Sequence, residues 1–144
     1  MTNNFNYKEV RGNYVHCLNA QCPRASECLR FMAAQHADAK IAAFQVVNPN
    51  FIASHEECSY FHSDQLIRYA VGITRLFNNI PYSKIRRIKG SIQAYFGRST
   101  YYRIYRKERY ITPNEQDFVR ALFLKEGIQE EPMFDEYIDT HAWY

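Results

Sequence analysis

Half of the positive charge of this chain is concentrated in residues 84–110. The stretch holds nine of the 18 lysine and arginine residues of the 144-residue sequence and only one acid, Glu108, which leaves it a net charge of +8. Residues 111–144 show the opposite balance, with two cations against eight acids. Charges at this density require contact with water or with a charged partner. One face of whatever structure forms over residues 84–110 must therefore lie at the surface.

The apolar residues of this stretch predict two helices separated by a break. Five of them recur at helical spacing and form one stripe: Ile85, Ile88, Ile92, Tyr95 and Phe96. Ser83 is a suitable N-cap for the first helix, and Gly97 is a suitable C-terminal stop. Ser99 can cap a second helix, whose inward face would consist of Tyr101, Ile104 and Tyr105.

A helix, a glycine turn and a short basic helix resemble the helix-turn-helix of bacterial DNA-binding proteins, and the segment GRSTYY at residues 97–102 is similar to their turn and recognition segment. In such proteins an apolar residue usually follows the glycine, where this chain has Arg98. The resemblance implies a DNA-binding regulatory protein whose second helix enters the major groove. The residues expected to contact double-stranded DNA are Lys84, Arg86, Arg87, Arg98, Ser99, Tyr102, Arg103, Arg106 and Arg109. RNA and protein are alternative partners, and the solvated side of an ordinary helical bundle can carry the same charges.

The four cysteines of the chain all lie in its first 58 residues, and the first three fall within 12 residues of one another: Cys17, Cys22, Cys28 and Cys58. Disulfides are disfavoured in a reducing cytoplasm, whereas thiolates are good ligands for soft metals. The expected site is therefore a four-cysteine metal site. Zinc is the expected metal, and an iron–sulfur cluster is the alternative.

Two other interpretations of the cysteines remain open. A set of three cysteines and one histidine is one of them, because His16 adjoins Cys17 while His55 and His62 flank Cys58. The other is that Cys28 is a small buried hydrophobic residue and that no metal binds. No catalytic residue is predicted, so the expected function is non-enzymatic. Besides the DNA-binding regulator with a structural metal site, the alternatives are a protein-interaction module with a structural cysteine lobe and an iron–sulfur sensor.

The periodicity of the whole chain predicts a mainly α fold in two parts. Residues 1–62 form a cysteine-containing lobe with a helix over 23–40 and one short strand over 41–47, which packs on a helical bundle of helix-turn-helix type at residues 63–144. The bundle would begin with a helix capped by Ser63 and lined by Leu66, Ala70, Ile73 and Phe77. Its last helix is opened by the capping box at residues 112–115 and closed by Gly127.

The C-terminal segment EEPMFDEYIDTHAWY mixes acids with aromatic residues and is expected to dock on its own domain. Binding of a partner, or competition with nucleic acid for the basic helices, is the alternative role. The chain has neither a secretory signal nor an apolar run of membrane-spanning length, so a cytoplasmic protein without a membrane partner is expected.

The pattern HC-x4-CP-x4-C at residues 16–28, followed by a tyrosine-rich basic helical end, also resembles an uncharacterised family of short bacterial proteins. The resemblance extends over nearly the whole chain. It implies the architecture and brings no established activity.

Overall fold

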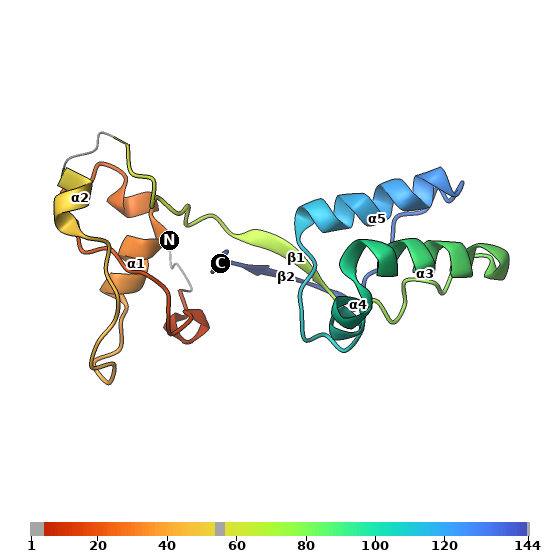
Figure 1. The fold of residues 1–144 in the computed structure, drawn as a ribbon, viewed down its shortest axis with the longest axis horizontal. Coiled ribbons are helices and arrows are strands. Elements are labelled where there is room, and N and C mark those ends of the chain that lie inside the picture. Colours follow the sequence, from red (N-terminus) through yellow and green to blue (C-terminus); the bar gives the residue numbers. More distant parts are fainter. Residues whose placement is uncertain (1–4, 54–56, 144) are drawn as a thin grey trace. The chain divides into compact units, whose positions relative to one another are not determined.

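The chain folds into two compact units, which the computed structural model describes for residues 5–53 and 57–143 (Figure 1). Unit 1 comprises residues 1–66 together with 141–144, and unit 2 comprises residues 67–140. The chain therefore enters unit 2 once and returns to unit 1 for its last residues. Among the described residues, no helix is long and apolar enough to span a membrane.

Unit 1 contains little regular secondary structure. Its described elements are two 3₁₀ turns, η1 (Tyr7–Glu9) and η2 (Ala25–Glu27), and two short helices, α1 (Leu29–Gln35) and α2 (Pro49–Ala53). A small core of Tyr14, Leu29, Ala33 and Trp143 holds the unit together. The C-terminal end of the chain is thus part of this core.

The predicted helix over 23–40 is shorter than expected, and the predicted strand over 41–47 does not form. Helix α1 stops at His36, and a turn follows in which the Asp38 side chain and carbonyl accept hydrogen bonds from the backbone N–H groups of Lys40 and Ile41. Beyond this turn, only a single parallel bridge joins Val46 to His16. An apolar run without a neighbouring strand cannot form a β-ladder, which explains the difference.

Unit 2 combines three helices with a two-stranded antiparallel sheet. The helices are α3 (Tyr82–Phe96), α4 (Arg98–Tyr105) and α5 (Pro113–Lys125), and the strands are β1 (Ile67–Val71) and β2 (Glu136–Thr140). The strands pair in a register that joins Ile67 to Thr140 and Val71 to Glu136. The apolar core lies beneath the helices and includes Ala70, Ile88, Ile92, Tyr101, Ile104, Ile111, Val119 and Phe123.

The prediction of a mainly α fold is wrong, because the segment expected to form the first helix of the bundle is a strand. Residues 67–71 pair with β2, and Ala70 also bridges to Ile111. Leu66, which the helical pattern would bury, is 61% exposed. The helical spacing of residues 66–77 is outweighed by pairing with a strand that lies about 70 residues further along the chain.

The helix-turn-helix bundle is not formed either. A helix-turn-helix joins its two helices by a turn of three or four residues. Here, Gly97 alone separates α3 from α4, and it serves as the C-cap of one helix and the N-cap of the next. The backbone of Gly97 has a φ of 83°, a left-handed conformation that glycine adopts without steric cost. No turn residue is available to pack between the helices, and Arg98 begins α4.

The local signals around the helices are confirmed in part. The capping box that opens α5 is present, with Thr112 and Glu115 exchanging side-chain and backbone hydrogen bonds, and Gly127 follows the helix with φ of 79°. Helix α3, however, begins at Tyr82 with Pro81 as its N-cap, so Ser83 lies within its first turn. Ser99 likewise lies inside α4 and caps nothing.

Candidate metal centre and basic helix face

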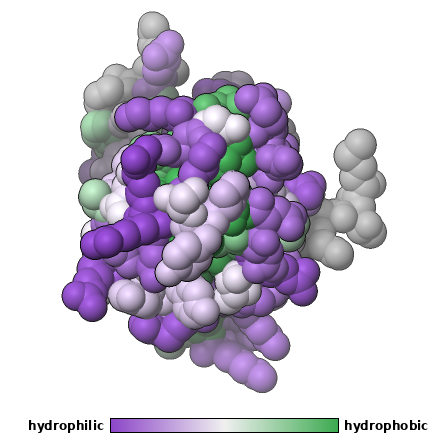
Figure 2. Space-filling model, turned by 90° about the vertical axis from the view of Figure 1, so that its right-hand side faces the viewer, coloured by the Kyte–Doolittle hydropathy of each residue, from purple (hydrophilic) through white to green (hydrophobic). Residues whose placement is uncertain are grey.

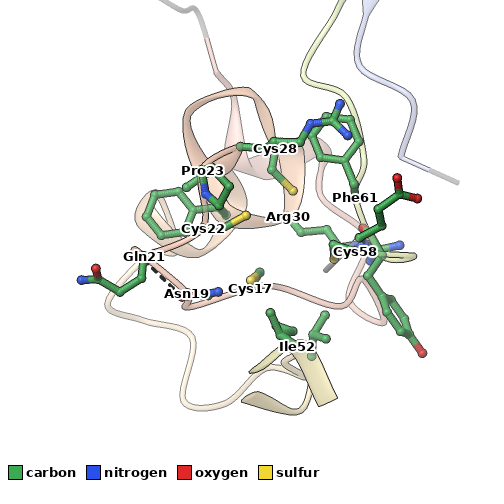
Figure 3. Close-up of a pocket in the computed structure, with 16 residues that line it drawn as sticks. Cys17, Asn19, Gln21, Cys22, Pro23, Cys28, Arg30, Ile52, Cys58 and Phe61 are labelled. Carbon is green, nitrogen blue, oxygen red and sulfur yellow. Dashed lines mark hydrogen bonds between the residues drawn. The ribbon is translucent and has the colours of Figure 1, made fainter. Parts of the chain in front are cut away.

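One cavity of unit 1 is lined by all four cysteines of the chain. It has a volume of about 470 Å³, and its walls also include Arg24, Arg30 and the apolar side chains of Val47, Ile52 and Phe61. Figure 3 shows Cys17, Cys22 and Cys28 around the centre of this cavity, with Cys58 on its facing wall. The four thiols are free, and Cys28 is the most buried of them.

The first three cysteines are positioned by a series of short turns. The Asn19 side chain accepts a hydrogen bond from the Gln21 backbone, and the carbonyl of Asn19 accepts one from Cys22 N. The carbonyl of Cys22 is in turn bonded to Ala25 N, at the start of η2. Cys28 follows η2 directly and is the N-cap residue of α1. These turns explain how the loose spacing of the cysteines still leads to one cavity.

Cys58 reaches the cavity through backbone contacts between two distant segments. Leu29 N donates to His62 O at 2.6 Å, and Asp64 N donates to Glu27 O at 3.0 Å. The Arg30 guanidinium adds a hydrogen bond from Nε to Tyr60 O. Residues 58–64 are thereby fixed beside the η2–α1 junction, although Cys58 lies 30 residues after Cys28 in the sequence.

The thiols are close enough to affect one another. Burial raises the pKa of Cys17, and the neighbouring thiols of Cys28, Cys58 and Cys22 raise this pKa further. No three His, Cys, Asp or Glu side chains in the described part of the chain already form a ready metal site. The cysteines thus share one cavity, but their sulfur atoms must move closer together to bind a single ion.

Neither His16 nor His62 lines this cavity. His16 is buried, its Nδ1 lies 2.9 Å from Tyr14 O, and its Nε2 lies 2.7 Å from Tyr7 Oη. A carbonyl only accepts, so Nδ1–H donates and Nε2 of the neutral ring accepts from the tyrosine. Burial lowers the pKa of His16, in agreement with a neutral ring. Both of its nitrogens are engaged, so it has no lone pair free for a metal.

His62 forms a second tyrosine–histidine pair. Its Nδ1 lies 2.7 Å from Tyr14 Oη, and burial raises the pKa of Tyr14 to about 12. Burial also lowers the pKa of His62, with smaller contributions from Arg30 and His141. His55, the third histidine considered for the site, lies outside the described residues. The described geometry therefore favours the four cysteines over a set of three cysteines and one histidine.

Two arginines of the cavity were missed in the sequence. Arg24 lies over the Phe61 ring at 3.3 Å from its centroid, and Arg30 donates from Nη1 to Val15 O and lies over the Tyr14 ring. Neither belongs to a run of charge, so no signal in the sequence marks them. Their guanidinium groups supply positive charge beside a set of thiols that would become negative on binding a metal.

The predicted nucleic-acid-binding residues divide into two groups in the structure. The residues of the first group form hydrogen bonds or salt bridges with other residues of unit 2. Lys84 Nζ donates to Glu126 O at 2.6 Å, Arg87 forms a salt bridge with Glu126, and Arg106 forms one with Glu108. Arg109 binds both carboxylate oxygens of Glu115, at 3.0 and 2.8 Å, and is half-buried. These four side chains have structural partners.

The second group is exposed. No salt bridge to Arg86, Arg98 or Arg103 is formed within residues 5–53 and 57–143. Ser99 and Tyr102 are also exposed on α4, and Tyr102 is in edge contact with the buried ring of Tyr101. We refer to Arg86, Arg98, Ser99, Tyr102 and Arg103 as the basic helix face.

The chain has no significant match among curated proteins. It also has none among solved structures, so neither comparison names a substrate, a ligand or a partner. A family model described as a family of unknown function, DUF6078, matches residues 1–143. The match extends over both units and includes every cysteine and every residue of the basic helix face. The protein therefore belongs to the DUF6078 family.

Proposed function

We propose that unit 1 is a metal-binding lobe that holds one zinc ion through Cys17, Cys22, Cys28 and Cys58. The observation that supports this proposal is that the four cysteines of the chain, drawn from two distant segments, line a single cavity. Four thiolates satisfy the tetrahedral coordination of a structural zinc site. The role of the ion is structural, since a site with four protein ligands leaves no position open for a substrate.

The surroundings of the cavity fit such a group. A zinc ion with four thiolates carries a net charge of −2, and the guanidinium groups of Arg24 and Arg30 border the same space. Unit 1 has only a small apolar core, and a bound metal supplies folding free energy that such a core lacks. Reduced thiols are required, so the proposal is consistent with a reducing compartment such as the cytoplasm.

The test is the metal content of the full-length protein, purified under reducing and anaerobic conditions. We expect about one zinc per chain by elemental analysis, with loss of the metal in Cys22→Ser. Gln21→Ala is the matched control, because Gln21 lines the same cavity without offering a thiolate, and it should keep the metal.

Substitution with Co²⁺ distinguishes the ligand set. A four-thiolate site should show intense sulfur-to-cobalt charge transfer that weakens in each cysteine variant. A brown protein that contains iron and sulfide would instead favour the iron–sulfur sensor. Metal-free protein that does not take up zinc or cobalt would refute the proposal.

A further inference from the structure

We propose that the exposed faces of α3 and α4 bind the sugar–phosphate backbone of double-stranded DNA without regard to its sequence. This inference does not depend on the metal site, which lies in the other unit. It is based on the charge of these faces, on a shallow hollow along α3 and on a solvent-facing glycine that the fold itself does not require.

The charge available for a partner is smaller than the sequence indicates but remains substantial. Arg86, Arg98 and Arg103 belong to two consecutive helices, and none of them forms a salt bridge within the described residues, although Arg103 lies near enough to Glu108 to help lower the pKa of that carboxyl. Helices α3 and α4 also pack against each other and are joined through Gly97 alone. Polyanions are the partners that such a surface attracts.

A hollow along the outer side of α3 gives this surface its shape. It has a volume of about 530 Å³ and is lined by Ser83, Arg86, Arg87, Gly90, Ser91 and Ala94. Four of these residues are small, and the other two are arginines. Figure 2, which views the end of unit 2 where α3 begins and α5 ends, shows hydrophilic side chains over most of this end and only a narrow apolar strip. The hollow itself is lined by polar, small and basic residues and by no large apolar side chain, which fits a hydrated partner better than an apolar protein.

Gly90 has no packing function inside the molecule. A Cβ added to it would meet no atom within 4 Å, although glycine in the middle of a helix is less stable than alanine by roughly 0.5–1 kcal/mol. Glycine is often found where a ligand approaches the backbone closely. A phosphodiester chain lying in the hollow would pass directly over this residue.

We expect the binding to be independent of DNA sequence, because the basic helix face offers phosphate contacts and no recognition helix. The base contact expected from a helix-turn-helix needs a recognition helix presented to the groove, and this fold has no such bundle. Arginine and serine side chains on an exposed helix can instead bind phosphate oxygens, which carry no sequence information. Ser99 and Tyr102 are the hydroxyl donors of the basic helix face for such contacts.

The test is a titration of the full-length protein with a labelled 20-base-pair DNA duplex over a salt series. The wild type should bind, and the logarithm of its affinity should fall linearly with the logarithm of salt concentration. The triple variant Arg86→Gln, Arg98→Gln, Arg103→Gln should bind roughly tenfold or more weakly at low salt, with a slope reduced by about 2 to 3, since each lost phosphate contact changes it by about 0.9. Duplexes of unrelated sequence should bind alike.

A matched control distinguishes the effect of the basic helix face on DNA affinity from the effect of net charge. The variant Arg68→Gln, Arg75→Gln, Arg120→Gln removes the same charge from other parts of unit 2 and should retain most of the affinity. Gly90→Ala and Gly90→Gln fill the hollow without a change in charge, and both should weaken binding, the glutamine more than the alanine. Far-UV circular dichroism establishes that each variant is folded.

Three outcomes would overturn the inference. The first is wild-type protein that does not bind duplex DNA at low salt. The second is an equal loss of affinity in the two triple variants, which would indicate a response to net charge alone. The third is binding of single-stranded RNA of the same length but not of the duplex, which would identify another partner.

Discussion

Glu115 has two structural roles in unit 2. Its carboxylate accepts a hydrogen bond from Thr112 N at 2.8 Å and thereby completes the capping box of α5. The same carboxylate binds the Arg109 guanidinium with two hydrogen bonds. Burial alone would raise the pKa of Glu115, but the hydrogen bonds from Arg109 and Thr112 outweigh it and hold this pKa below the usual value of 4.5. The carboxylate is therefore stabilised in the folded state.

Substitution of Glu115 by glutamine should reduce the free energy of unfolding of unit 2 by about 1 kcal/mol at pH 7. A carboxylate with a lowered pKa contributes stability above its unfolded pKa, and the contribution is lost as the pH falls through the folded pKa. The difference between variant and wild type should thus shrink below about pH 4. Urea unfolding followed by far-UV circular dichroism at pH 7 and pH 3 measures both values.

Glu130→Gln provides the comparison for this experiment. Glu130 is exposed and forms no salt bridge among the residues that the structure describes. Its replacement should change the stability by less than about 0.5 kcal/mol at either pH. A Glu115→Gln protein as stable as this control at pH 7 would contradict the role assigned to Glu115.

At the residue scale, the sequence identifies a cap only where the chemistry is reciprocal. The Thr112–Glu115 box was predicted correctly because both side chains and Pro113 point to the same helix start. Ser83 and Ser99 were predicted as caps because serine favours that position, yet Pro81 and Gly97 occupy it. A single serine is compatible with several neighbouring helix starts, so it does not by itself identify the cap.

At the element scale, the turn after β1 holds the strand pair together. Gly72 has φ of 81°, and its carbonyl accepts a hydrogen bond from Asp135 N, just before β2. The Asp135 carboxylate also accepts hydrogen bonds from Thr74 N, Thr74 Oγ1 and Arg75 N. The end of β1 and the start of β2 are thus tied by one carboxylate.

Gly72→Ala should destabilise unit 2 by roughly 1–3 kcal/mol, because the new Cβ would collide with the Asp135 carboxylate and would occupy a left-handed backbone conformation. Thermal unfolding followed by far-UV circular dichroism measures the effect. Gly90→Ala is the matched glycine control and should raise stability by up to about 1 kcal/mol. Equal melting temperatures for the two variants would show that the turn is not under this constraint.

Helices α3 and α5 could be predicted from local sequence, whereas the strands could not. Each helix has a long amphipathic stripe and a stop or cap beside it. Strand β1 is only five residues long, and its partner β2 lies in the acidic tail, whose residues 136–139 are all exposed. Short strands gain their stability from pairing, and nothing local in the sequence indicates which distant segments pair.

At the scale of the whole molecule, the two units can be followed separately in one experiment. Trp143 is the single tryptophan of the chain and is buried in the core of unit 1, while the longer helices belong to unit 2. Tryptophan fluorescence therefore reports on unit 1, and far-UV circular dichroism reports mainly on unit 2.

Removal of zinc with a chelator should lower the unfolding midpoint seen by Trp143 fluorescence and leave the circular dichroism transition nearly unchanged. The reason is that metal binding contributes to the folding free energy of the unit that contains the ligands. Re-addition of zinc should restore the fluorescence midpoint, but not in Cys22→Ser. A chelator that shifted both transitions equally, or neither, would contradict a metal confined to unit 1.

The candidate sites were predicted to different extents. The convergence of the four cysteines follows from their clustering in the sequence, although the contacts that bring Cys58 to the others, such as the bond from Leu29 N to His62 O, are not visible there. Lys84, Arg86, Arg87, Arg98 and Arg103 lie on the two predicted helices, whereas Arg106 and Arg109, also expected on the second helix, follow its end at Tyr105. Which of them are neutralised depends on acids such as Glu115 and Glu126, whose positions are set by tertiary packing.

The pairing of Ile67 with Thr140 has a topological consequence. These residues are the first and last of unit 2, and paired residues in an antiparallel ladder have Cα atoms about 4.5–5.5 Å apart. Unit 2 is thus nested within unit 1 as an insertion whose two ends meet, and a linker of only a few residues would span the distance between them. Residues 67–140 could therefore be excised and the cut ends of unit 1 joined by a short linker, or unit 2 could be circularly permuted by joining its own two ends.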